Sequence, residues 1–562
     1  MTIMEHTRPS RRFRRGLHTP GCARLHTSAA LALASLALAL GGCTGEIGDS
    51  ERPPIEDIPP DDPIRSTPIF HFEPEDPSTQ PGVRRLTKHE LERALIDLTG
   101  VSPDLSDLPE DLESLNLQND AARLTVRDGN HLLAMMRVAH EVAVAADVDG
   151  LLPCAGDCTD AELRNYLEHV FVEPVNDTGL ADYRTLYDRA LTELDGENAR
   201  RAVIQTSLMS PHFHYRTELG DGGDELTAHE LAEKLSYFAW GRPPDAELRA
   251  KADDGSILEA EIYAAEVDRL LADARTEERV VELIFDWLGL DHFDLQSKDA
   301  SADLPPELED SMFAEVEAMI RAELFEGEGT LRSLLTTDAT QVDELLAGHY
   351  GIDGVTGSEL QPVSLEGTGR SGLLTTALVL GAHAKESGRS PMQRGKFLVD
   401  ELMCMGFPPE AGAAAMMLPS DVEDLTFREQ FAPLEETLPC SNCHQMLNAG
   451  FAFDVFDNVG RRYPLDRVGD EEAQGFFNLA PYAQMNFENT IEANEGFAQH
   501  GALVRCFVAQ THRYAQGSVP SVDDAELMGE LEAAFDANDG HVLNLMRDIA
   551  LSERFAQPAE GS

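Results

Sequence analysis

The chain has 562 residues, of which 42% are hydrophobic, so it is long enough for several domains with buried cores. Its 101 acidic residues outnumber its 44 lysines and arginines, which gives a formal net charge of −57. A surface of this charge repels the phosphate backbone, so we expect no nucleic-acid partner.

Residues 1–42 have the pattern of a bacterial lipoprotein signal peptide. Arginines cluster near the start, and a run of alanine and leucine over 29–40 is too short to span a membrane as a helix. The run ends in Leu40-Gly41-Gly42-Cys43, which resembles a lipobox, where cleavage precedes a cysteine that then carries lipid. We therefore expect an exported protein anchored to a membrane through Cys43. The alternative is an ordinary signal peptide with a small-residue cleavage site.

Residues 43–83 are rich in proline, aspartate and glutamate, and such a segment cannot bury a core. We expect it to act as an extended tether.

Beyond this tether, apolar residues recur at helical spacing and strand patterns are few, so we predict a mainly α fold of several helical domains in tandem. Thr87 and Glu90 form a capping-box pattern that starts a helix, and Gly100 stops it. Leu226–Leu231 repeats the pattern of Leu86–Leu91, which we interpret as shared helix-start chemistry because the residues downstream do not match. The expected helical domains before the haem motif are 84–150, 151–219, 220–298 and 299–424.

Two shorter predictions concern the fourth of these domains. Helical spacing continues through 331–348, which we expect to be helical. Residues 351–369 are polar and rich in glycine, and we expect them to form a loop.

The pentapeptide Cys440-Ser441-Asn442-Cys443-His444 has the spacing of a c-type haem attachment site. One helical turn presents both thiols to the porphyrin vinyl groups, and the following histidine places its imidazole under the iron. A redox-active cysteine pair would need a βαβ context, and a zinc site would need two further ligands at matching spacing. We therefore predict one covalent haem c, held by Cys440, Cys443 and His444 in a small cytochrome c-like segment, 425–475. A C-terminal helical domain, 476–562, follows.

The sequence does not determine which residue is the second axial ligand of the iron. Met485 ranks first, because it lies 41 residues after His444 in the chain, a spacing seen for distal methionines in small cytochromes. A methionine ligand would raise the reduction potential and a histidine would lower it. The other possibilities are a vacant position or one of four further residues: Met416, Met417, His500 and His512.

Aromatic and basic residues follow the pentapeptide. Phe451, Phe453 and Phe456 are expected to line the haem edge, although ordinary core packing would use them in the same way. Arg461 and Arg462 are positive in an acidic chain and are candidates to pair with the haem propionates. The alternative for both arginines is an ion pair with a neighbouring carboxylate.

Four of the eight cysteines remain once Cys22 of the signal segment and the lipid and haem positions are set aside: Cys154, Cys158, Cys404 and Cys506. An even number is expected in an oxidising compartment. Cys154 and Cys158 could close a tight loop, and Cys404 and Cys506 could bridge the two flanks of the haem segment.

Several motifs extend beyond the pentapeptide. They are Arg85–Gly100, Leu235–Trp240 with Pro244-Asp245, Arg370–Leu374, Ser390-Pro391 with Arg394-Gly395, Gly450–Phe453, Phe456–Arg461 and Cys506–Gly517. Together they resemble the planctomycete-type cytochrome c domain and its companion domains of unknown function, which occur in planctomycete and myxobacterial secreted proteins. The resemblance implies an exported, c-type cytochrome-like protein and implies no substrate. Domains of this type usually continue the motif as Cys-His-x-x-Met-Asp-Pro. In this chain Met446 comes one position earlier than that methionine, and the proline is absent.

These observations predict a lipid-anchored protein of the cell envelope that transfers single electrons through its haem. So negative a surface favours a basic redox partner, which would be steered electrostatically. Two alternatives are a non-redox surface protein, in which Cys440 and Cys443 are structural, and a haem oxidase or peroxidase with an open iron position.

Overall fold

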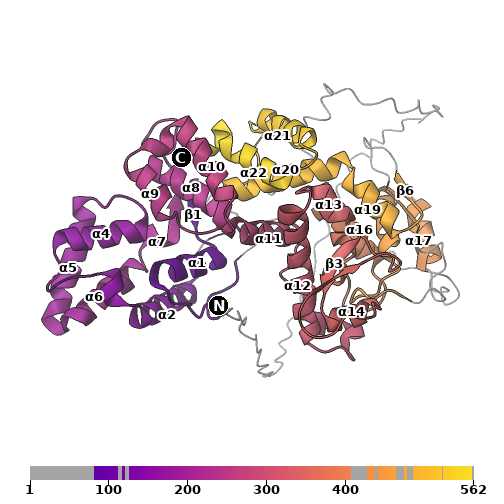
Figure 1. The fold of residues 1–562 in the computed structure, drawn as a ribbon, viewed down its shortest axis with the longest axis horizontal. Helices are drawn as coiled ribbons and strands as arrows, with labels where there is room; N and C mark the ends of the chain where they lie inside the picture. The colour runs from indigo at the N-terminus through magenta and orange to yellow at the C-terminus, as the bar shows by residue number, and fades with distance from the viewer. Residues whose placement is uncertain are drawn as a thin grey trace, which may run out of the picture. The chain divides into compact units, whose positions relative to one another are not determined.

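The computed structural model describes residues 82–111, 117–119, 124, 126–406, 427–436, 441–463, 474–477, 485–521 and 523–559. The signal segment 1–42, Cys43, nearly all of the tether, and Cys440 lie outside the described residues, as do the side chains of 441–443. The described part contains 22 α-helices and three two-stranded antiparallel sheets, which confirms the mainly α prediction (Figure 1). Among the described helices, none combines the length and apolar character that a membrane-spanning helix requires.

One apolar core gathers the helices before residue 215. They are α1 (Lys88–Thr99), α2 (Gly129–Ala145), α3 (Val148–Leu151), α4 (Asp160–Phe171), α5 (Asp177–Glu193), α6 (Gly196–Ser207) and α7 (Pro211–His214). Strand β1 (Val83–Arg85) pairs with β2 (Tyr215–Thr217), with Arg84 opposite Arg216. Residues of both 84–150 and 151–219 therefore contribute to a single core.

A second apolar core contains buried residues from Leu226 to Phe555, together with Leu117. Its helices in the first half are α8 (Ala228–Trp240), α9 (Ala246–Asp253), α10 (Ala260–Leu271), α11 (Arg275–Trp287), α12 (Glu307–Arg321), α13 (Leu331–Thr336) and α14 (Glu344–Tyr350). The later helices are α15 (Ala377–Ala382), α16 (Pro391–Phe397), α18 (Ser441–Leu447), α19 (Thr490–Ala498), α20 (Gly501–Gln516), α21 (Ala525–Ala537) and α22 (Val542–Leu551). Helix α17 (Phe427–Glu436), of which no described side chain belongs to this core, packs against α18.

Local capping chemistry sets the ends of two helices that share a sequence pattern. Thr87 with Glu90 and Thr227 with Glu230 each form a complete capping box at the start of α1 and α8. Both helices end at a glycine in the left-handed conformation, where a side chain would be strained. The helix predicted at Thr87 is confirmed.

Helical structure was predicted over 331–348, and the prediction is wrong at residues 339–342, which form a strand. Strand β3 (Ala339–Val342) separates α13 from α14 and pairs with β4 (Gln361–Ser364), which lies inside the predicted loop. In β3, Thr340 and Val342 are β-branched and buried, and they point to the same face of the strand. Thr340 also donates a hydrogen bond to buried Glu315, a tertiary contact that helical periodicity does not report.

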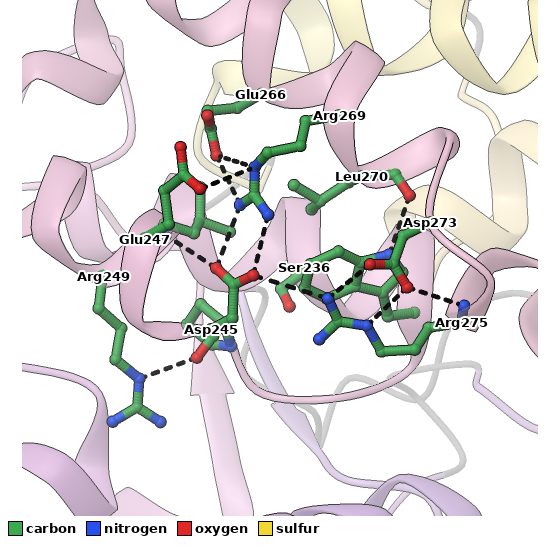
Figure 2. A network of polar contacts seen from close by, with 12 residues as sticks. Ser236, Asp245, Glu247, Arg249, Glu266, Arg269, Leu270, Asp273 and Arg275 are labelled. Atoms are coloured by element: carbon green, nitrogen blue, oxygen red, sulfur yellow. Dashed lines mark hydrogen bonds and ion pairs between the residues drawn. The ribbon is translucent and has the colours of Figure 1, made fainter.

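A network of ion pairs joins Asp245, Arg269, Asp273 and Arg275 (Figure 2), and both arginines lie over the ring of Trp240. The guanidinium of Arg275 lies 3.3 Å from the centre of the Trp240 ring and binds Asp273 with two bonds of 2.8 Å. Asp245 caps α9 and accepts two bonds from Arg269, of 2.9 and 3.1 Å. The motif that ends in Asp245 therefore fastens the buried indole to α10 and α11.

Two disulfide bonds join the four cysteines that the described residues contain outside the haem motif. Cys154–Cys158 closes the loop between α3 and α4. Cys404–Cys506 ties α20 to the end of the helical stretch Leu398–Leu402, which continues α16. Both are the pairings considered from the sequence.

Candidate haem attachment site

Cys443 and His444 lie on α18, a helix of two turns within the described residues. This helix contacts α16, α17, β5 (Gly475–Phe477) and the 3-10 helix of residues Asn448–Phe453. Of the three predicted haem-attaching residues, His444 is the one whose side chain is described. A helical start after the first cysteine is the local structure that the attachment motif needs.

Two glycines let α16 cross directly against the chain that follows His444. A Cβ built on Gly450 would lie 1.9 Å from the carbonyl oxygen of Pro391, and one on Gly395 would lie 2.2 Å from that of Leu447. Only hydrogen fits at either position, because both obstacles are backbone atoms. The two glycines therefore fix α18 and the Asn448–Phe453 helix against α16.

Arg394 holds the turn that follows this crossing. Its guanidinium is buried and donates to the carbonyl oxygens of Phe453, Phe456 and Asp457 at 2.7, 2.8 and 2.6 Å. A further bond of 3.1 Å reaches Leu380 in α15. Burial lowers the pKa of Arg394 to about 10, which leaves it charged at neutral pH. The sequence did not predict that Arg394 would bind these carbonyl groups. What pointed to Arg394 was its place in the motif Ser390-Pro391 with Arg394-Gly395.

The imidazole of His444 faces an aromatic environment. Its ring centre lies 6.3 Å from that of Phe431, which in turn lies 6.3 Å from Phe451. Phe451 is 1% exposed, and the guanidinium of Arg428 lies 4.3 Å from its ring centre. Burial lowers the pKa of His444, which favours the neutral imidazole that ligates metals. Its Nδ1 is buried, without a hydrogen-bond partner in the part of the chain that the structure describes. These residues fit one side of a haem.

Arg461 is engaged by a carboxylate. Its Nε lies 2.9 Å from an oxygen of Asp457, and its backbone N–H donates to the other oxygen at 2.8 Å. Arg462 donates to the carbonyl of Thr368 at 3.0 Å. Arg461 therefore forms an ion pair with a neighbouring carboxylate, which was the alternative to pairing with a haem propionate.

Met485 lies on β6 (Met485–Phe487), opposite Phe477 of β5. Its sulfur is 3.4 Å from a Cβ built on Gly496 of α19, so it packs toward that helix. Strand β5, which pairs with β6, also contacts α18.

The other distal candidates are dispersed. His500 caps α20 and packs edge-on against Phe477, with ring centres 5.5 Å apart. His512 is 1% exposed within α20, and Met416 and Met417 lie outside the described residues. Among the described residues, no group of three or more His, Cys, Asp or Glu is arranged to hold a metal ion.

A buried polar network around Glu315 of α12 reaches the predicted haem segment, and no sequence pattern indicated it. Glu315 is 1% exposed and accepts hydrogen bonds from Thr340, at 2.9 Å, and from the hydroxyl of Tyr350. The guanidinium of Arg370 lies 3.8 Å from the Tyr350 ring centre and 4.7 Å from that of Phe456. Arg370 therefore connects this network to the phenylalanines of the haem segment.

Glu315 is expected to make stability depend on pH. Burial raises its pKa to about 7, above its ordinary value of 4.5. Between these values the folded protein holds a proton that the unfolded chain has lost, so stability falls as pH rises through this interval. Relative to Glu315→Gln, the wild type should lose about 2–3 kcal/mol between pH 4.5 and pH 8. Urea unfolding of both proteins measures this difference, and a constant difference would refute the prediction.

Three domain-family models match the chain. Residues 84–148, 226–352 and 370–464 match families described as proteins of unknown function, DUF1587, DUF1592 and DUF1588. These are domains that accompany the planctomycete cytochrome c domain. The third match contains both Gly395 and Gly450 as well as Arg394 and His444. Neither a curated protein nor a solved structure matches the chain.

Proposed function

We propose that this protein is an exported, lipid-anchored, c-type cytochrome-like electron carrier with one haem c attached at Cys440 and Cys443. The observation that carries the proposal is the position of His444, on a helix that two glycines fix against α16, with its imidazole next to Phe431 and the buried Phe451. His444 is the proximal ligand, and Met485 is the first candidate for the distal position. The matches to companion domains of a cytochrome c domain support the same class of protein.

The surrounding residues have separate tasks in this proposal. Bound haem supplies one-electron chemistry at its iron. Phe451 and Phe431 exclude water from the His444 side, and Arg394 keeps the turn behind Phe453 in place. Cys43 anchors the protein by lipid, and the acidic surface favours a basic redox partner.

Absorption spectra of cysteine variants test this proposal. The protein is produced in a host that attaches haem c, and the spectrum of the reduced form is recorded before and after acid–acetone extraction. We expect a sharp α band that survives extraction in the wild type and is lost from the double variant Cys440→Ser/Cys443→Ser. The control Cys154→Ser/Cys158→Ser removes a distant disulfide and should retain the band. A double variant with the wild-type spectrum would refute the proposal.

Carbon monoxide then separates electron transfer from catalysis at an open iron. An iron ligated on both sides should not bind carbon monoxide, and Met485→Ala should open the site to it. Binding by the wild type would instead favour an oxidase or peroxidase.

A further inference from the structure

Exposed apolar side chains gather on one helix of the first core, α2. Of the nine large hydrophobic side chains that are exposed in the described part of the chain, five lie on α2 or just before it: Val126, Leu132, Leu133, Met136 and Val144. The last four are between 44% and 56% exposed. Single exposed apolar residues are ordinary, whereas a contiguous group marks a contact surface.

The four apolar residues on α2 share the side of the helix that faces water. The opposite side, with Ala134, Met135, Val138 and Val142, is buried in the first core, where α2 packs against α6. We call the exposed side the α2 face; it consists of Leu132, Leu133, Met136, Arg137, His140, Glu141 and Val144.

The α2 face carries two opposite charges one helical turn apart, at Arg137 and Glu141. Arg137 also pairs with Asp107, but both of these side chains are more than half exposed, so that pair is weak and Arg137 stays accessible. His140, between the two charges, is hydrogen-bonded to Gln205 of α6 at 3.2 Å.

These charges decide between the possible occupants of the α2 face. Arg137 and Glu141 cancel each other, so the face does not select a basic protein, although the whole chain has a formal net charge of −57. A helix that lies on a membrane carries several lysines or arginines on its polar side, whereas α2 contains one arginine and no lysine.

The α2 face is complementary to a second copy of itself in the antiparallel orientation. A two-fold axis beside the middle of the helix places Arg137 of one copy next to Glu141 of the other, and Leu132 next to Val144. The midpoint of the first pair is residue 139 and that of the second is residue 138, so one axis serves both contacts. Because the interface is symmetric, each contact occurs twice.

The α2 face has the size of a weak interface. The helix has 17 residues and is therefore about 25 Å long. Two helices of this length, packed side by side, bury on the order of 1,000 Å² over both copies, which is at the lower limit for a specific interface. A dissociation constant of about 1–100 µM is expected for such a contact.

We propose that the α2 face binds a second copy of this chain, helix against antiparallel helix, to form a two-fold symmetric dimer. Removal of the apolar side chains from water supplies the driving force, and Arg137 with Glu141 sets the orientation. The dimer depends neither on haem attachment nor on the lipid anchor.

Sedimentation velocity of the full chain, at concentrations up to about 200 µM, tests the dimer. Every protein carries Cys43→Ser, so that no lipid causes association. We expect this parent protein to dimerise, and Leu133→Glu to weaken the association at least about tenfold, because the carboxylate would be buried in an apolar contact. The control Leu258→Glu makes the same change at a side chain that is 51% exposed elsewhere, and it should dimerise as the parent does.

Exchange of the two charges tests the orientation. Arg137→Glu and Glu141→Arg each turn two attractive contacts into repulsive ones, so each variant alone should associate at least about tenfold more weakly than the parent. An equimolar mixture of the two variants should form a mixed dimer with nearly the parent's affinity, because every contact then joins opposite charges. All of these side chains are exposed, so the variants should fold, which circular dichroism verifies.

Three results would overturn the proposal. One is a parent protein that stays monomeric at the highest concentration; if it also binds phosphatidylcholine vesicles through Leu133, the α2 face belongs to lipid. Another is a dimer that Leu133→Glu leaves unchanged. The third is a mixture of the two charge variants that associates no better than either variant alone.

Discussion

Replacing Gly450 by alanine is expected to destabilise the protein by about 3 kcal/mol or more, beyond the usual range for an added methyl group in a core. The new Cβ would lie 1.9 Å from the carbonyl oxygen of Pro391 and 2.5 Å from the backbone nitrogen of Gly395. Both obstacles are backbone atoms of α16, so the clash cannot be relieved by a side-chain rotation. Urea unfolding followed by circular dichroism measures the change in the free energy of unfolding.

The matched control is Gly529→Ala. Gly529 lies on the exposed surface inside α21, and a Cβ there meets nothing within 4 Å. Alanine should stabilise that helix by about 0.5–1 kcal/mol because glycine is the poorer helix former. If Gly450→Ala were as well tolerated as this control, the direct crossing of α16 over the haem segment would be wrong.

Replacing Arg279 by methionine should cost about 3–5 kcal/mol, the range found when one member of a buried ion pair is removed. Arg279 is 3% exposed and Glu90 is fully buried, and their side chains come from helices 189 residues apart. Arg279 also lies over the ring of Tyr514, at 4.3 Å from its centre, so one guanidinium connects α1, α11 and α20. The expected loss arises because the buried side chain of Glu90 would lose its closer cationic partner and retain Arg84, at 3.9 Å.

A double-mutant cycle distinguishes the ion pair from a general packing defect. Glu90→Gln removes the carboxylate that Arg279 binds. The double variant should therefore be about 1–3 kcal/mol more stable than the sum of the two single losses in unfolding free energy predicts. Arg547→Met breaks an exposed ion pair with Asp268 and should cost less than about 1 kcal/mol. Additive losses at Arg279 and Glu90 would contradict the assigned pairing.

Local chemistry explains what the sequence alone could predict. The start of α1 at Thr87 and its end at Gly100 depend on neighbours within four residues, and both were predictable. The attachment pentapeptide is equally local, and its residues 441–444 lie on α18, the helical conformation that its spacing predicts. The strand β3 was missed because it is stabilised by pairing with β4, twenty residues away, and by the hydrogen bond from Thr340.

The frame around His444 depends on contacts that leave no local pattern. Arg394 binds carbonyl groups about sixty residues further along the chain. A carbonyl is present at every residue, so no sequence pattern marks it as the partner of an arginine. Glu315 is similar, since its raised pKa is caused by burial beneath β3 and α14. In an acidic chain with 101 carboxylates, nothing in the sequence singles out this one.

The most direct test of the central claim is the mass of one tryptic peptide. Cleavage after Arg428 and Arg461 releases residues 429–461, which contain Cys440, Cys443 and His444. From protein purified under denaturing conditions, after production in a host that attaches haem c, we predict the mass of this peptide plus one haem. The mass of the peptide with free cysteines, or with a disulfide between them, would contradict the account.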